Sequence, residues 1–79
     1  MNRNEIQQHV FHAIQKLTGE EVIIKPSAKL EEDLGLDKID IYLILEEVSK
    51  SHKIITSEED CENLSKKNVS YLVEWICQH

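Results

Sequence analysis

Glycine, proline and cysteine are scarce in this sequence of 79 residues, which contains two glycines, one proline and two cysteines. Hairpin turns usually need glycine or proline, so their scarcity disfavours a sheet built from hairpins. Cys61 and Cys77 resemble neither a disulfide framework nor a clustered zinc site. We therefore interpret both as free thiols of a protein in the reducing cytoplasm.

Basic residues are also few, with 9 Lys and Arg against 15 Asp and Glu, and the net charge is -6. This balance argues against binding to nucleic acid or anionic membrane surfaces, and it favours a protein partner with a basic patch. Long apolar runs are missing: the longest, Ile41 to Leu45, is too short to span a membrane. The N-terminal residues lack the apolar core of a secretory signal.

A chain of this length is expected to form one domain, residues 1–79, with little room for a large internal active site. Apolar residues at helical spacing predict an all-α fold of three main helices and one short helix. The first helix has Asn4 as its expected cap and ends at Gly19, and a long loop spans residues 20–36. The remaining helices are expected at Asp37 to about His52, at Ser57 to Leu64, and at about Ser65 to Gln78.

Ten aliphatic side chains on the inward stripes are expected to form the core: Ile6, Val10, Ile14, Leu17, Leu45, Val48, Leu64, Val69, Leu72 and Ile76. Five apolar residues of the long loop can attach it to this core: Val22, Ile23, Ile24, Leu30 and Leu34.

The second helix has apolar residues on two sides. Ile41, Leu45, Val48 and His52 share one face, with Ile44 at its edge, whereas Ile39, Tyr42 and Leu43 lie roughly opposite. Two interpretations remain open. Either the helix is central and covered on both sides, or the side of Ile39 and Leu43 is exposed and binds another protein.

The stretch "LEEDLGLDKIDIYLILEE" resembles the acyl carrier proteins, whose hallmark is an acidic D-L-G-x-D-S-L motif that opens the second helix. The first helix, the long loop, "SEEDCENL" and the final "LVEWI" follow in the family's order, so the likeness covers essentially the whole chain. The resemblance implies a four-helix bundle. It also implies a protein that carries acyl groups on a phosphopantetheine arm and is not an enzyme.

The chain departs from the family at the residue that matters most. The resemblance places the serine that bears phosphopantetheine at Lys38, and a lysine has no hydroxyl to form the phosphodiester. Ser27 and Ser49 are not shifted copies of the motif. No cofactor is therefore expected. Phosphopantetheine is expected only under the alternative that the chain is a working carrier. Leu43 and Ile44 also stand where many carriers display glutamates.

Other chemistry finds little support in the sequence. Lys38 is not on a hairpin, unlike the lysines of lipoyl and biotinyl domains, and Asp37 and Asp40 beside it favour an ordinary protonated lysine over a Schiff-base nucleophile. His9 and His12 lack further ligands, so no metal site is expected. Neither a catalytic triad nor a phosphate-binding loop is present. Tyr71 and Trp75 either pack against the loop or third helix, or form a small aromatic contact patch.

Three functions remain. The first is a carrier-like binding module that has lost its arm and acts through protein contacts of the second helix, as a monomer or weak dimer. The second is a working acyl or peptidyl-type carrier in fatty-acid, polyketide or lipid biosynthesis. The third is a small binder of lipid or acyl ligands. For the first, carrier recognition and helical spacing indicate a docking surface of six residues: Asp37, Lys38, Ile39, Leu43, Glu46 and Glu47.

Overall fold

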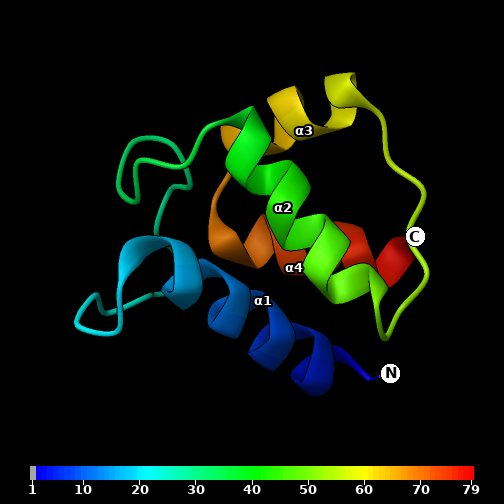
Figure 1. Ribbon diagram of the computed structural model, residues 1–79, viewed down its shortest axis with the longest axis horizontal. Coiled ribbons are helices and arrows are strands. Elements are labelled where there is room, and N and C mark those ends of the chain that lie inside the picture. Colours follow the sequence, from blue (N-terminus) through cyan, green and yellow to red (C-terminus); the bar gives the residue numbers. More distant parts are fainter. Residues whose placement is uncertain (1) are drawn as a thin grey trace.

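Four helices form the regular structure of residues 2–79, the part of the chain that the computed structural model describes (Figure 1). They are α1 (Arg3–Thr18), α2 (Lys38–Ser49), α3 (Glu58–Ser65) and α4 (Val69–Gln78). α2 packs against α1 on one side and α3 on the other, and α1 also packs against α4. The expected all-α fold is confirmed, and none of these helices is both long and apolar enough to cross a membrane.

The helix boundaries follow from side chains that accept hydrogen bonds from the first free backbone N–H groups. Asp37, Ser57 and Asn68 cap α2, α3 and α4, and Gly19 ends α1 with φ 106°, a backbone conformation that favours glycine. Three expected boundaries were wrong. Asn2 rather than Asn4 caps α1, α2 ends at Ser49 rather than near His52, and α4 begins at Val69 rather than near Ser65.

Nine of the ten aliphatic residues predicted to form the core are buried, each at most 2% exposed. The prediction for Leu17 is wrong, because this side chain is 40% exposed in the last turn of α1. Ile44 is fully buried, in agreement with helical spacing, which places it at the edge of the inward face, and not with the family resemblance, which places it on the displayed side. Of the loop residues predicted to attach the loop to the core, Leu30 is fully buried and does so, whereas Ile23 is 81% exposed and does not.

The long loop is tied to the turn between α3 and α4, which is distant in sequence. Backbone hydrogen bonds join Leu30 N to Lys67 O (2.9 Å) and Val69 N to Ala28 O (2.9 Å). Leu36 at the end of the loop is also buried, a core residue that helical periodicity did not reveal. Because Leu30 and Leu36 fix the end of the loop to the core, the start of α2 has a defined position beside α3.

Candidate functional site

The start of α2 is built by the motif Asp33-Leu34-Gly35-Leu36-Asp37. Gly35 has φ 68°, a conformation that costs other residues energy, and it turns the chain after Asp33. Asp37 then accepts hydrogen bonds from the N–H groups of Ile39 and Asp40, both at 3.0 Å. The Asp40 carboxylate accepts in return from Asp37 N at 3.1 Å, which completes a capping box. Lys38 is thereby the first residue of the helix.

The ammonium group of Lys38 lies 2.7 Å from Oε1 of Glu58 on α3. This hydrogen bond and the charge of Glu58 raise the pKa of Lys38, and the same hydrogen bond and the charge of Lys38 lower the pKa of Glu58. The sequence predicts that Asp37 and Asp40 compensate the lysine. The charge of Asp37 does raise the pKa of Lys38, but the carboxylates of both aspartates cap the helix, and the main partner of the ammonium group is Glu58.

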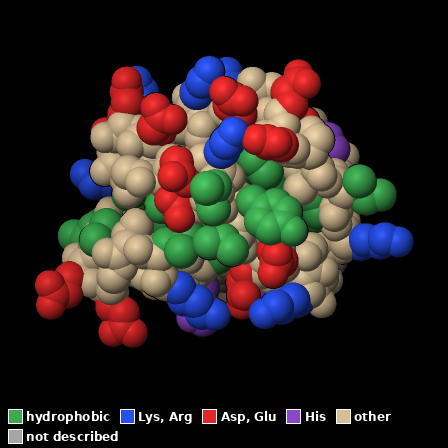
Figure 2. All heavy atoms as spheres, turned by 45° about the horizontal axis from the view of Figure 1, so that its top comes forward, with side chains coloured by type: hydrophobic (Ala, Val, Ile, Leu, Met, Phe, Trp, Pro, Cys, Tyr) green, Lys and Arg blue, Asp and Glu red, His purple; other side chains and the backbone are tan. Residues whose placement is uncertain are grey.

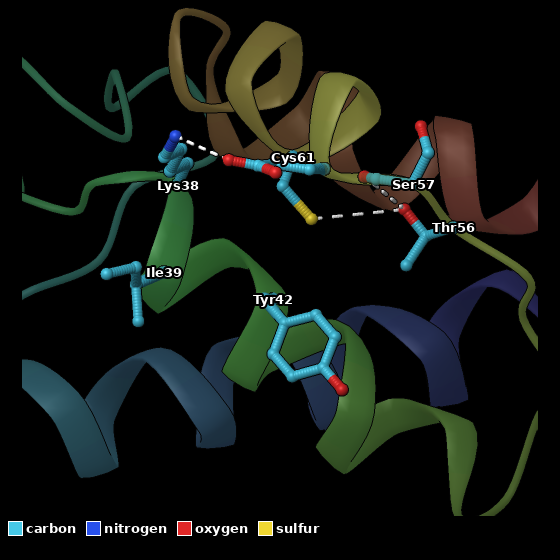
Figure 3. A pocket seen from close by; sticks show the side chains of 7 residues that line it. Lys38, Ile39, Tyr42, Thr56, Ser57 and Cys61 are labelled. Atoms are coloured by element: carbon cyan, nitrogen blue, oxygen red, sulfur yellow. Dashed lines mark hydrogen bonds and ion pairs between the residues drawn. The ribbon is translucent and has the colours of Figure 1, made fainter.

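A pocket of about 250 Å³ lies between the start of α2 and the start of α3 (Figure 3). Ile39 and Tyr42 line its α2 side and are 63% and 52% exposed. Cys61 of α3 also lines it but is only 2% exposed, and burial raises the pKa of its thiol. Sequence reasoning noted Cys61 only as a free thiol. Its place in the helical repeat of "SEEDCENL" was the signal that it faces inward.

Two further hollows flank α2. The first, which we call the α1 hollow, has a volume of about 160 Å³ and an apolar lining of Ala13, Leu17, Leu43 and Ile44. The second, the loop hollow, has a volume of about 310 Å³ and an apolar lining of Tyr42, Leu45, Ile54 and Ile55. Figure 2 shows apolar side chains gathered across one face of the molecule, with charged groups along their borders.

The charged groups beside the α1 hollow are mostly paired. Glu47 accepts hydrogen bonds from Lys16 of α1 and from Lys50, both at 3.1 Å. These two lysines lower the pKa of the Glu47 carboxyl. Glu46 lines both the α1 hollow and the loop hollow, and it is exposed. No ion pair of Glu46 occurs among the described residues.

The structure places the six candidate docking residues on the outside of α2 and around its start, but it divides them. Lys38 and Ile39 line the pocket toward α3, whereas Leu43, Glu46 and Glu47 line the hollow toward α1. Asp37 is exposed and serves as the cap. Of the two interpretations of α2, the exposed one fits Leu43, which is 44% exposed. Tyr42, which the sequence places on this side of the helix, belongs to the same face. Leu17 and Ile55 belong to it as well, and they were not predicted there.

The aromatic pair of α4 lines none of these three hollows. Tyr71 is 49% exposed, and the Lys67 ammonium lies 5.3 Å from its ring centre. Trp75 packs against the core and stacks on His79, with ring centres 4.0 Å apart. A metal centre is not indicated, since no cluster of three His, Cys, Asp or Glu side chains suited to an ion occurs in residues 2–79.

The residues present do not fit a phosphopantetheine arm. The resemblance assigns the arm to position 38, and there the ammonium group of Lys38 is bonded to Glu58. Ser49 is at the other end of α2, where its hydroxyl donates to Glu46 O at 2.7 Å. Ser57 lines the pocket beside Lys38, but its Oγ accepts from Asp60 N as the cap of α3. No hydroxyl therefore stands at the start of α2.

Comparison with known proteins shows a similarity over most of the chain. The chain is 32% identical over 75 residues to "Acyl carrier protein" from Phytoplasma mali (strain AT), in an alignment that covers 89% of this chain and 87% of that protein. No family model matches the chain. No solved structure matches it either.

Proposed function

This chain belongs to the acyl carrier protein family, and from that premise we propose that it is a carrier-like binding module without a phosphopantetheine arm, acting through protein contacts of α2. Acyl carrier proteins are not enzymes, so the prediction of a non-catalytic protein is confirmed by the family. The loss of the arm and the use of α2 are the parts that we propose.

The observation that carries the proposal is Lys38 at the start of α2. Attachment of the arm needs a hydroxyl oxygen at this position, and an ammonium group bonded to Glu58 at 2.7 Å supplies none. The surrounding motif, from Asp33 to Asp37, is otherwise that of the family. A chain that keeps the scaffold but lacks the attachment point has the partner surface, kept or repurposed, as its main functional feature.

The exposed side of α2 supports this use. Ile39 and Leu43 are large apolar side chains that are 63% and 44% exposed, and Asp37, Lys38, Glu46 and Glu47 border them. An apolar centre with a polar rim is the composition of a protein interface. The net charge of -6 favours a partner with a basic patch. We further propose a monomer or weak dimer in the cytoplasm.

Intact mass spectrometry tests the loss of the arm. The protein is incubated with a phosphopantetheinyl transferase and coenzyme A, and a carrier protein with an intact D-S-L motif serves as the positive control. We expect the mass of this chain to remain unchanged while the control gains one arm. A mass increase that maps to Lys38 or to any serine overturns the proposal and restores the working carrier in acyl or peptidyl transfer.

The pocket between α2 and α3 favours a second candidate function, the binding of a small lipid or acyl ligand. Its volume of about 250 Å³ and the apolar groups of Ile39, Tyr42 and Cys61 suit part of an aliphatic chain. Native mass spectrometry of the freshly purified protein distinguishes this candidate. A lipid that co-purifies with the wild type but not with Tyr42→Asp supports ligand binding, and a ligand-free wild type counts against it.

A further inference from the structure

The α1 hollow and the loop hollow lie on the two flanks of α2, with Glu46 between them. Leu17 and Leu43 line the first hollow, and Tyr42 and Ile55 line the second. All four side chains are at least 40% exposed although they are large and apolar. Glu46 lines both hollows, so the two apolar depressions are joined by a single carboxylate.

The charges at this surface indicate what kind of group faces Glu46. Lys16 and Lys50 are both bonded to Glu47, so their nearest carboxylate is that of Glu47 and not that of Glu46. Lys38 is paired with Glu58. Of the two carboxylates that line these hollows, Glu47 is paired, and Glu46 has no ion pair among the described residues. Electrostatic complementarity then favours a Lys or Arg on the partner between two apolar side chains.

The distance between the hollows follows from the helix that separates them. An α-helix with its side chains is about 10–12 Å across, and residues seven apart on a partner helix are separated by about 10 Å along its axis. A helix that crosses α2 can therefore place one apolar side chain in each hollow. Residues at i+3 or i+4 lie on the same face and between the two anchors. A basic residue at one of these positions faces Glu46.

We propose that these two hollows and Glu46 bind an amphipathic helix of another protein, with apolar side chains at i and i+7 and a Lys or Arg at i+3 or i+4. This inference rests on the proposed function and specifies the chemistry of its partner. It extends the docking surface beyond α2, to Leu17 on α1 and Ile55 in the loop before α3.

A second copy of this chain does not suit the surface. Two copies each carry a net charge of -6 and repel one another. The required pattern is also missing from the four described helices. No basic residue of α1 or α2 has apolar residues of its own helix at the matching positions on both sides, since Leu34 before Lys38 lies outside α2, and α3 and α4 contain no Lys or Arg. The occupant is therefore a different protein.

A designed peptide tests the proposal without knowledge of the natural partner. The probe is a fluorescently labelled synthetic helix of about 20 residues, above the length at which isolated helices are marginal, with Leu at i and i+7, Lys at i+3 and i+4, and Ala and Gln elsewhere. The control peptide has the same composition, with the second Leu moved to the opposite face. Fluorescence anisotropy with the unmodified full chain should give a dissociation constant about tenfold lower for the probe.

Matched variants locate the binding site. Leu17→Asp, Ile55→Asp and Glu46→Lys should each weaken probe binding about tenfold. Ile23→Asp is the control for the apolar variants, because Ile23 is 81% exposed and Ile55 is 82% exposed. Glu59→Lys is the control for charge, because it changes the net charge as Glu46→Lys does. Both controls should alter the dissociation constant less than about twofold, and circular dichroism should show that every variant keeps its helicity.

Three outcomes overturn the inference. Equal binding of the two peptides shows attraction by charge alone. Equal weakening by the control variants shows that the hollows are not the site. Sedimentation velocity that reveals a dimer dissolved by Leu17→Asp shows that a second copy covers this face. None of these outcomes changes the intact mass after transferase treatment, so failure here is distinct from failure of the proposed function.

Discussion

At the first position of α2, Lys38 experiences two opposing electrostatic effects. The N-terminal end of the helix dipole disfavours a cation. The Glu58 carboxylate at 2.7 Å favours it and raises the pKa of the lysine. Since Asp37 and Asp40 already satisfy free N–H groups of the helix, the lysine side chain can reach across to α3. It links two helices where the family's motif has its serine.

Burial separates two leucines that the helical pattern had placed in the same class. Leu45 is 1% exposed and Leu17 is 40% exposed. Leu45→Ala leaves a cavity in the core and should lower the free energy of unfolding by about 2–5 kcal/mol. Leu17→Ala should lower it by less than about 1 kcal/mol, because much of its side chain is already in water. Urea unfolding of the two variants checks the difference, and equal losses would show that Leu17 belongs to the core.

Leu43 provides the residue-scale test of the docking surface. Its side chain is 44% exposed and points away from the buried face of α2. Leu43→Asp should therefore leave the helicity and the melting temperature nearly unchanged, while binding of the designed helical peptide falls about tenfold or more. Leu45→Asp, two residues later on the buried face, is the control and should unfold the protein. Unfolding by Leu43→Asp itself would assign Leu43 to the core and remove the main support for docking.

At the scale of the element, the start of α2 depends on one side chain. Asp37 accepts hydrogen bonds from two backbone N–H groups, both at 3.0 Å. Asp37→Ala should lower the free energy of unfolding by about 0.5–2 kcal/mol, whereas Asp37→Asn should preserve most of it because asparagine caps equally well. Urea unfolding distinguishes the two. An equal loss in both variants would show that the charge of Asp37, rather than its capping geometry, supports the helix.

The elements were predictable where a local signal was strong. The cap at Asp37, the glycine at the end of α1 and the buried stripe of Ile41, Leu45 and Val48 were all readable from short-range spacing. The start of α4 was not. Ser65 is the last residue of α3 and Asn68 is the cap of α4, and serine and asparagine are both common caps, so residue type alone did not show which of them begins the helix. Such a boundary is decided by the backbone bonds that the long loop makes to this turn.

At the scale of the whole molecule, the site depends on contacts that spacing along the chain does not reveal. Lys38 and Glu58 are twenty residues apart, yet they form the ion pair that borders the pocket. Leu17 of α1 and Leu43 of α2 line the same hollow, and Ile55, from the loop before α3, lines the other. Sequence reasoning found the outer residues of α2 because they repeat at helical intervals. The neighbours contributed by other elements follow only from the packing of those elements.

The ion pairs between helices make the stability of the molecule depend on pH. Glu47 joins α2 to α1 through Lys16, and Glu58 joins α3 to α2 through Lys38. In the folded protein these lysines lower the pKa of both carboxyls from the usual 4.5. As the pH falls below 4.5, the unfolded chain therefore binds protons at these positions before the folded protein does. Their contribution is present above this pH and is lost as the pH falls through the lowered pKa values.

A double variant, Glu47→Gln with Glu58→Gln, isolates this contribution. It should melt at a lower temperature than the wild type at pH 7, and its melting temperature should decline less between pH 5 and pH 3, because two carboxyls with lowered pKa values are gone. Glu59→Gln, an exposed glutamate of α3 without an ion pair in the described structure, is the control and should follow the wild type. At about 1 M salt the Debye length is only about 3 Å, so the difference between wild type and double variant at pH 7 should shrink. A double variant with the full acid sensitivity of the wild type would show that these pairs do not couple the helices.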